Sequence, residues 1–421
     1  MNQPKMAIRL AFLIVSGFAS SVALCQNMNS PYSIYGIGDI DHRVYNRTSG
    51  MAGTGMATKA SFDLVNNNPA AIAGLPRSFL LLSAAAVGKT VQYAGTGVDA
   101  SNRNNRDLWI KGITLGIKIN KFWASSIGFK QFSNVNYNFT GTKGVVGDND
   151  TYSAQYTGDG GLNDYYWTNA VSLGKHFSVG VKSSIIAGGI NQTETIVNTV
   201  SSSTIQTKQL DYYGDPRFEY GAIYSTPINK NWGLSLGGKF INKTKLNSER
   251  TLNVMENSTV LVNDEFIENN HFFLPKTYSA GITLVHKNRT TFAADYTFEN
   301  WSPLNIFGNG WSLVNSNKVS AGVEIAKNVQ MFGQTVQKSY LQFGGFYTNS
   351  YLDVNNTLVN EFGITAGMGG AISKNLLYSV SAEGGKRGTT VNGLIREGFF
   401  QLTFALTYRD ILISQKRGKY D

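Results

Sequence analysis

One pattern in the sequence has residue types and a spacing that could support catalysis. Residues 233–237 read Gly-Leu-Ser-Leu-Gly, which matches the Gly-x-Ser-x-Gly pattern of a nucleophile elbow. That pattern works only at a sharp turn from a strand into a helix. Here it lies inside an alternating run, residues 232–240, which predicts a strand with no helix after it. We therefore expect no nucleophile at Ser235 and no enzyme activity.

The histidines and a glycine-rich stretch are equally weak candidates for metal or phosphate binding. His42, His176, His271 and His286 are isolated, and none has a second ligand three or four residues away. The glycine-rich stretch at residues 50–57 is followed by no Lys-Ser or Lys-Thr pair, as a phosphate-binding loop requires. We expect no cofactor, and the small residues of this stretch predict tight packing instead.

The N-terminus predicts export from the cytoplasm. Lys5 and Arg9 precede the apolar residues 10–15, and Ala23-Leu24-Cys25 ends in small residues. This is the pattern of a secretory signal peptide, residues 1–25, cleaved before Gln26. The alternative is that Cys25 is a lipoprotein cysteine, although Leu24 is large for the position before it. With cleavage after the only cysteine, the mature chain forms no disulfide.

The charge balance points to a membrane surface. The formal net charge is +10, yet only 15% of the residues are charged. Lys and Arg are scattered singly, without the long basic runs of a tail that binds nucleic acid. We therefore expect no nucleic-acid partner, and a basic surface that faces anionic headgroups of the outer-membrane lipid.

Alternation of apolar with polar or small residues dominates the chain from residue 77 to residue 410. In residues 292–299, Phe292 and Tyr296 belong to the apolar set, while Asp295 and Glu299 belong to the other. Side chains of a strand point alternately to its two faces, so each run has one apolar face. About 14 such runs predict an all-β transmembrane antiparallel β-barrel. A soluble β-sandwich is the alternative, and the export signal and long runs weigh against it.

The segments between the runs fit a barrel. Short turns are expected at residues 229–231, 287–289 and 373–375, and long polar loops at residues 141–150 and 247–270. Outer-membrane barrels combine short turns at one end with longer loops at the other. Tryptophans fall near the ends of runs, which predicts aromatic girdles at the two membrane interfaces. They are Trp109, Trp123, Trp167, Trp232, Trp301 and Trp311.

The segment before the barrel, residues 26–76, does not alternate and is rich in Gly, Asn and Ala. It predicts a hatch that folds inside the barrel lumen. A tail that merely leads into the first strand is the alternative. Small or turn-forming residues are the candidate hatch and gating residues: Gly50, Gly53, Gly55, Asn68, Pro69 and Ala70. Residues 411–421 form a C-terminal tail after the last expected strand.

Three motifs together resemble the FadL family of outer-membrane transport proteins for fatty acids and hydrocarbons. The first is the glycine-rich stretch 50–57 followed by Asn68-Pro69-Ala70. The second is Leu274-Pro275 before the strand at residues 278–282, and the third is Asp295 followed by Trp301-Ser302. The opening residues 30–39 and the C-terminal tail depart from the family pattern, so the chain resembles a divergent branch.

The resemblance implies a barrel of 14 strands, a hydrophobic pocket, and a kinked strand that opens a lateral exit for a hydrophobic small-molecule ligand. By position the kink falls in the third run, at Gln131, Phe132, Ser133 and Asn134, where alternation is lost. A related branch implies the alternative function, an interaction component of protein export similar to the type IX secretion shuttle. Exported or secretion-system proteins would then be the partners.

Charged residues of the expected hatch complete the set of candidates. Asp39, Asp41, Asp63, Arg43 and Arg47 face potential partners on the barrel wall. These partners are Lys111, Lys118, Asp295, Glu299, Glu324 and Glu383. Such charges can simply keep a polar lumen hydrated. Alternatively, the pairs hold a closed state, which a ligand shifts only if it binds the open state more tightly.

Overall fold

The computed structural model describes residues 30–61, 63–77, 79–98, 103–144, 151–198, 203–331 and 334–411. The predicted signal peptide lies outside these residues, as does the predicted C-terminal tail beyond Ile411. Among the described residues, no helix has the length and apolar character that crossing a membrane requires.

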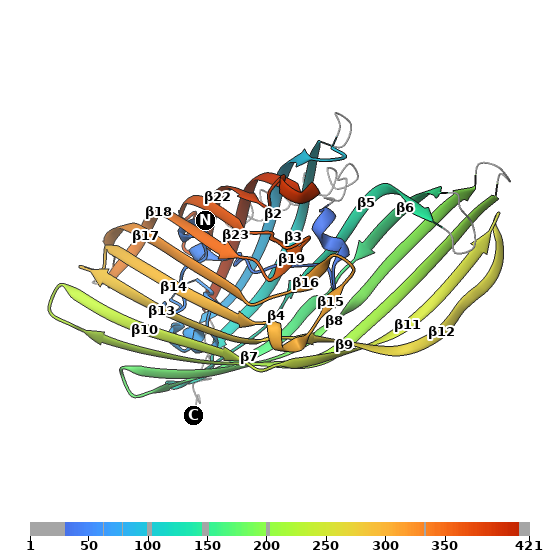
Figure 1. Ribbon diagram of the computed structural model, residues 1–421. Coiled ribbons are helices and arrows are strands. Elements are labelled where there is room, and N and C mark those ends of the chain that lie inside the picture. The colour runs from blue at the N-terminus through green and yellow to red at the C-terminus, as the bar shows by residue number, and fades with distance from the viewer. Residues whose placement is uncertain are drawn as a thin grey trace, which may run out of the picture.

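The wall of the molecule is a closed antiparallel barrel of 14 strands, as predicted (Figure 1). Ten wall strands are continuous: β2 (Phe79–Gly95), β3 (Asn104–Lys118), β8 (Phe177–Asn198), β9 (Ser203–Pro227), β14 (Thr290–Asn300), β17 (Ser316–Met331), β18 (Gln334–Asn349), β21 (Glu361–Ala371), β22 (Leu376–Arg387) and β23 (Ile395–Ile411). The last strand pairs with the first, Phe79 with Ile411 and Gly95 with Ile395, and this closes the barrel.

Four wall positions are each filled by two shorter strands with a break between them. These are β4 (Trp123–Gln131) with β5 (Ser133–Gly144), β6 (Thr151–Gly160) with β7 (Asn163–Leu173), β10 (Trp232–Ile241) with β11 (Thr244–Glu256), and β12 (Thr259–Leu274) with β13 (Lys276–His286). Pro275 separates the last pair, and proline cannot donate a ladder hydrogen bond.

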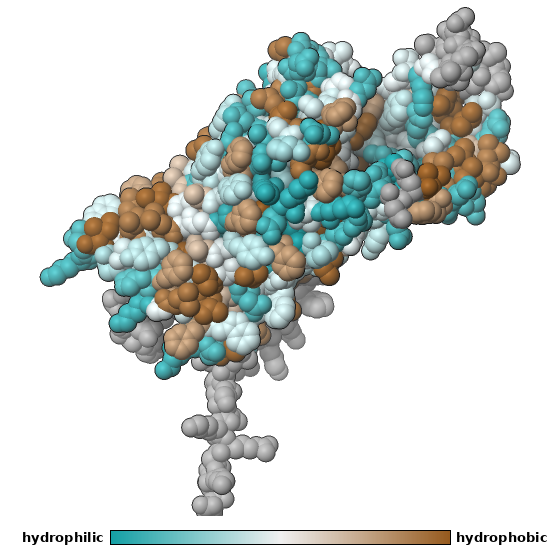
Figure 2. Space-filling model, turned by 60° about the horizontal axis from the view of Figure 1, so that its bottom comes forward, coloured by the Kyte–Doolittle hydropathy of each residue, from teal (hydrophilic) through white to brown (hydrophobic). Residues whose placement is uncertain are grey.

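Alternation sorts side chains between the lumen and the outside. On β14, Phe292 and Tyr296 are exposed on the outer surface, while Ala293 between them is buried. Patches of apolar side chains lie over the outer face (Figure 2). A closed barrel satisfies its own backbone hydrogen bonds, and an apolar outer face suits lipid.

Short elements lie in two places. One set precedes the wall and packs inside the barrel, and the other set belongs to the loops at one end of the barrel. Those before the wall are η2 (Pro31–Ile34), β1 (Asp39–Ile40), η3 (Arg47–Met51) and η4 (Pro69–Gly74). Those in the loops are η5 (Ser302–Leu304), β15 (Phe307–Gly308), β16 (Trp311–Leu313), β19 (Leu352–Val354), β20 (Thr357–Leu358) and η6 (Val391–Gly393), all at the same end of the barrel. We call this end the long-loop end, and the opposite end, with the turn at residues 287–289, the short-turn end.

One predicted loop is wrong, and the other begins later than predicted. Residues 141–144 belong to β5, and residues 145–150 lie outside the described residues. Residues 247–270 are not a loop, because β11 and β12 form a hairpin from Thr244 to Leu274. Together with β5, β6, β8 and β9 this hairpin extends past the rest of the barrel (Figure 1). Burial alternates along β11 only as far as Glu249, and the register between β11 and β12 shifts from Arg250 onward. A regular alternation therefore does not mark the outer part of this hairpin.

The predicted tryptophan girdle is wrong for three of its members. Trp301 is only 1% exposed and belongs to an apolar cluster inside the barrel. Trp311 packs against the same cluster, with its ring centroid 5.3 Å from that of Tyr35. Trp109 is half-buried, and its Nε1 donates to Gln131 Oε1 at 2.9 Å. Trp123 and Trp167 are exposed on the outer surface, as an interfacial ring requires. Position near a strand end does not reveal which face a side chain occupies.

Candidate functional site

The N-terminal segment, which we define as residues 30–75, packs against the inner wall where that wall is built of glycine. A Cβ added at Gly221 would lie 1.9 Å from Asn68 Oδ1, and one at Gly180 would lie 2.5 Å from the carbonyl carbon of Pro69. Inward glycines on further strands approach Gly50, Met51 or Met56 in the same way: Gly237, Gly281, Gly322, Gly344 and Gly367. Hydrogen is therefore the only side chain that lets the backbones come this close.

Asn68 connects the segment to two wall strands. Its Nδ2 lies 3.0 Å from Met56 O, 3.2 Å from Ala222 O and 3.1 Å from Gly238 O. Its Oδ1 accepts from Ala70 N at 3.0 Å and so caps η4. Asn68 and Ala70 are completely buried, and Pro69 occupies the first position of η4, where its missing N–H costs nothing.

Two of the three candidate glycines also lie at this contact. A Cβ at Gly50 would lie 2.5 Å from Gln342 Oε1 and 2.7 Å from Gly367 Cα. Gly53 has a φ of +73°, which favours glycine. Gly55 N donates to Asp295 Oδ2 at 2.7 Å. The structure thus brings five of the six candidate residues to the contact between segment and wall, while Gly53 contacts Val44 within the segment. The gating role of all six stays a prediction.

Two arginines of the segment reach carboxylates on the wall. Arg43 Nε donates to Glu383 Oε1 at 2.8 Å, and Arg43 also contacts Glu361. Arg47 Nη2 lies 2.5 Å from Glu324 Oε1. These side chains are mostly buried, and an unpaired charge at such a site would destabilise the folded protein. The ion pairs therefore hold the segment in position against the wall.

Two aspartates of the segment complete the ionic contacts. Asp41 Oδ2 lies 2.8 Å from Lys111 Nζ, and Asp39 Oδ2 lies 2.7 Å from Arg387 Nη1. Burial tends to raise the pKa of both carboxyls. For Asp39 the Arg387 guanidinium outweighs burial, and for Asp41 the Lys111 ammonium and Arg43 do. Both pKa values are therefore held below the usual range.

These aspartates predict a pH-dependent attachment of residues 39–41. A carboxyl whose folded pKa is lowered contributes stability that is fully present above its unfolded pKa of about 4. That contribution is lost as the pH falls through the lower folded pKa. Hydrogen exchange, corrected for its intrinsic pH dependence, should show weaker protection at residues 39–41 below about pH 4. Residues 69–74, which the Asn68 amide holds, are the internal control, and an equal response in both stretches would contradict the account.

The barrel wall is interrupted next to this segment. The ladder between β3 and β4 runs from Lys118 paired with Ala124 to Gly112 paired with Lys130. Beyond it, β5 pairs with β6 and with β1, and among the described residues no pairing joins β5 to β3. Phe132 separates β4 from β5. The wall therefore has a break beside Phe132, towards the long-loop end.

The four residues predicted as a kink lie at this break. Gln131 is the last residue of β4, while Ser133 and Asn134 begin β5 and pair with Ile40 and Asp39 of β1. Gln131 Oε1 accepts hydrogen bonds from Trp109 Nε1 and Lys111 Nζ, both on β3. Side chains thus join β3 and β4 where the backbone ladder stops.

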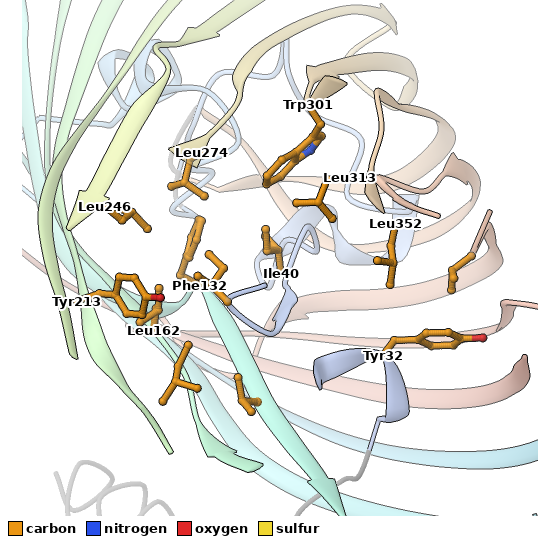
Figure 3. Packing of buried hydrophobic residues seen from close by; sticks show 14 of the residues in the cluster. Tyr32, Ile40, Phe132, Leu162, Tyr213, Leu246, Leu274, Trp301, Leu313 and Leu352 are labelled. Carbon is orange, nitrogen blue, oxygen red and sulfur yellow. The ribbon is translucent and has the colours of Figure 1, made fainter. Parts of the chain in front are cut away.

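An apolar cluster lines the lumen at the long-loop end, beside the break. Wall residues such as Tyr213, Leu246 and Leu274 and loop residues such as Trp301 and Leu352 surround Ile40 (Figure 3). Tyr32, Ile37 and Ile40 of the segment and Phe132 at the break belong to the same cluster. The segment's own apolar side chains therefore fill an apolar site that opens towards the break.

A cavity of about 220 Å³, lined by both polar and apolar side chains, lies between the segment and the wall. Lysines and arginines of β4, β8, β9 and β10 line it, together with Asn66, Asn67 and Asn68 of the segment. These wall cations could not be recognised as a group from the sequence. Their cross-strand register, with Lys182 opposite Glu219 and Lys130 opposite Asp164, becomes visible only once strand pairing is known.

The remaining candidates, Ser235 and His42, each contact a neighbouring side chain. Ser235 lies inside β10, and its Oγ donates to Ser225 Oγ at 2.9 Å, so it sits at no strand-to-helix turn. His42 Nδ1 lies 3.3 Å from Glu299 Oε1. Among the described residues, no group of three or more His, Cys, Asp or Glu side chains is placed to hold a metal ion.

Comparisons with known proteins agree with this architecture. A protein-family model described as BamG matches residues 6–420. A FadL homologue of Pseudomonas aeruginosa is 13% identical over 89% of this chain and 100% of that one, with a TM-score of 0.58. The toluene transporter TbuX of Ralstonia pickettii is 13% identical over 87% and 98%, with a TM-score of 0.57. No curated protein sequence matches significantly.

The toluene transporter TodX of Pseudomonas putida is 12% identical over 88% of this chain and 99% of its own, with a TM-score of 0.56. At such identities these likenesses establish the shared barrel fold. The predicted resemblance to FadL-family barrels is confirmed, and the BamG match names a family that the sequence motifs had not identified.

Proposed function

The chain belongs to the BamG family, and we propose that it is an outer-membrane channel for hydrophobic small molecules, which pass by diffusion and leave sideways through the wall. The observation that carries the proposal is the break between β3 and β5, with Phe132 of the apolar cluster beside it. A ligand in that cluster needs no aqueous step to reach the lipid around the barrel.

The energetics favour a sideways exit for an apolar ligand. Each CH₂ kept out of water is worth about 0.8 kcal/mol, so a path from apolar cluster to lipid avoids a large penalty. The part of the lumen that contains the buried ion pairs of the segment offers an apolar molecule no such path, because the molecule would have to displace charged groups from their partners. In this proposal residues 30–75 act as the hatch, and Tyr32, Ile37 and Ile40 occupy the ligand's place until it arrives.

Closing the break should stop transport. The only cysteine of the chain, Cys25, falls in the predicted signal peptide, so two introduced thiols can be linked selectively. We expect Trp109→Cys with Gln131→Cys, joined by a short bismaleimide, to reduce uptake of radiolabelled oleate roughly tenfold. Uptake is measured in cells that lack their own fatty-acid channel, and the unlinked double variant gives the reference.

The matched control is Leu115→Cys with Ile127→Cys, a pair that faces across the intact ladder between β3 and β4. Linking this pair should leave uptake unchanged, because the strands are already joined there. Equal uptake by the linked and unlinked forms of the Trp109 and Gln131 pair would refute the lateral route. Absence of oleate and toluene uptake above empty cells would refute the proposed function itself.

A further inference from the structure

The cavity between segment and wall has a cationic side. Four of its cations lie on one part of the wall: Lys130 on β4, Lys182 on β8, Arg217 on β9 and Lys239 on β10. Their alternation places all four on the lumen side. Arg43, Lys111 and Lys318 line the cavity as well, and Arg43 and Lys111 are paired with carboxylates. Two carboxylates stand among the first four cations, Asp164 on β7 and Glu219 on β9.

One lysine already forms ion pairs with both carboxylates. Lys182 Nζ lies 2.6 Å from Asp164 Oδ2 and 2.9 Å from Glu219 Oε1. Lys239 Nζ is 3.8 Å from the other oxygen of Glu219, a weak contact. Two positive charges of this group of six therefore have no matching negative charge within it.

Arg217 is the side chain that most needs a partner. It is only 8% exposed, and its guanidinium makes no hydrogen bond or ion pair with the described part of the chain. The guanidinium packs on the Phe132 ring, 5.2 Å from the ring centroid. A buried charged donor without an acceptor destabilises the folded protein. We therefore expect this site to bind an acceptor that carries negative charge.

Further unmatched donors line the same cavity. Lys130 likewise forms no hydrogen bond or ion pair with the described residues, and Thr277 Oγ1 is buried without a partner. Three more acidic residues line the cavity. Asp41 pairs with Lys111, and Glu299 contacts His42. Asp295 Oδ2 accepts from Gly55 N and Met56 N, while its Oδ1 is buried without a hydrogen-bond partner.

We propose that this cavity binds a phosphate group between Arg217, Lys130 and Lys239. A phosphate carries close to two negative charges near neutral pH, which matches the excess of two in the cationic group. The planar fork of Arg217 suits two oxygens of a tetrahedral anion, and the flexible lysines reach the others. The cavity borders the apolar cluster, because Ile40, Phe132, Leu274 and Trp301 line it as well.

Titration calorimetry on the purified full-length barrel in detergent tests the proposal, at constant ionic strength. Inorganic phosphate and short-chain dihexanoyl phosphatidic acid are the two probes, with nitrate as the anion control. Saturable binding of free phosphate identifies a soluble anion as the ligand, and binding of the lipid alone identifies a lipid headgroup. In either case Arg217→Gln should weaken binding roughly tenfold or more.

Arg250→Gln is the control, because Arg250 pairs with Asp211 away from the cavity and its loss should leave phosphate affinity unchanged. Lys130→Gln provides a second test if Arg217→Gln fails to fold, as judged by heat-modifiable gel migration. The proposal is overturned if neither probe binds saturably, if nitrate competes as well as phosphate, or if both cavity variants bind phosphate like the unaltered protein. None of these results would alter the expectation for oleate uptake.

Discussion

Asn68→Asp should release the N-terminal segment from the wall while the barrel itself stays folded. The substitution keeps the shape of the side chain and the cap on Ala70 N. It replaces the donating amide with a carboxylate that faces the oxygens of Met56, Ala222 and Gly238. Loss of these buried hydrogen bonds should cost about 3 kcal/mol, or roughly a 100-fold rise in the opening constant.

Hydrogen exchange of residues 50–75 measures that opening constant. Asn66→Asp is the matched control, since Asn66 is exposed and its Oδ1 already acts as an acceptor for Asn46 Nδ2. Exchange in the control should match the unaltered protein. If Asn68→Asp leaves protection of residues 50–75 intact, Asn68 does not anchor the segment.

Gly221→Ala should have a comparable effect from the other side of the same contact. The added methyl would lie 1.9 Å from Asn68 Oδ1 and 2.8 Å from Pro69 Cδ, far inside any tolerable contact. Overpacking of this kind costs about 1–3 kcal/mol when the neighbours can shift, and here the neighbours are a buried cap and a proline ring. We expect η4 to leave its site on β8 and β9.

Single-channel recording in planar bilayers detects that displacement, because a barrel whose segment has moved should conduct ions at a higher level. Gly233→Ala is the control, since an added methyl there meets nothing within 4 Å. Equal conductance of both variants and the unaltered protein would contradict the claim that wall glycines seat the segment.

The barrel itself could be predicted from the sequence because its signal is repeated along the chain. Alternation in runs such as residues 292–299 reflects a wall with lipid on one side and a polar lumen on the other. Where that contrast is absent the prediction failed, as in the hairpin of β11 and β12, which extends beyond the rest of the barrel. Trp301 was misplaced for a related reason, because the lumen at the long-loop end is itself apolar.

Part of the candidate site could be predicted from the sequence. Turn and cap chemistry marked Asn68-Pro69-Ala70 and the glycines of residues 50–55, and lost alternation marked residues 131–134. The glycines on the opposing wall were missed, although glycine within a strand is a recognised signal of close backbone approach. Gly180, Gly221 and Gly237 occur on consecutive wall strands, but only the strand register shows that they lie side by side. The cationic group around Arg217 was missed for the same reason.

The lateral route for a hydrophobic ligand is tested most directly by photolabelling. A diazirine derivative of oleate is bound to the purified barrel and activated by light, and the labelled residues are identified by peptide mass spectrometry. The proposed route predicts label at Phe132, at Trp109 and along β5, with less label when unmodified oleate competes. Label confined to outward-facing residues such as Phe218 and Tyr220, unaffected by competitor, would show that oleate meets only the outer surface and would contradict the account.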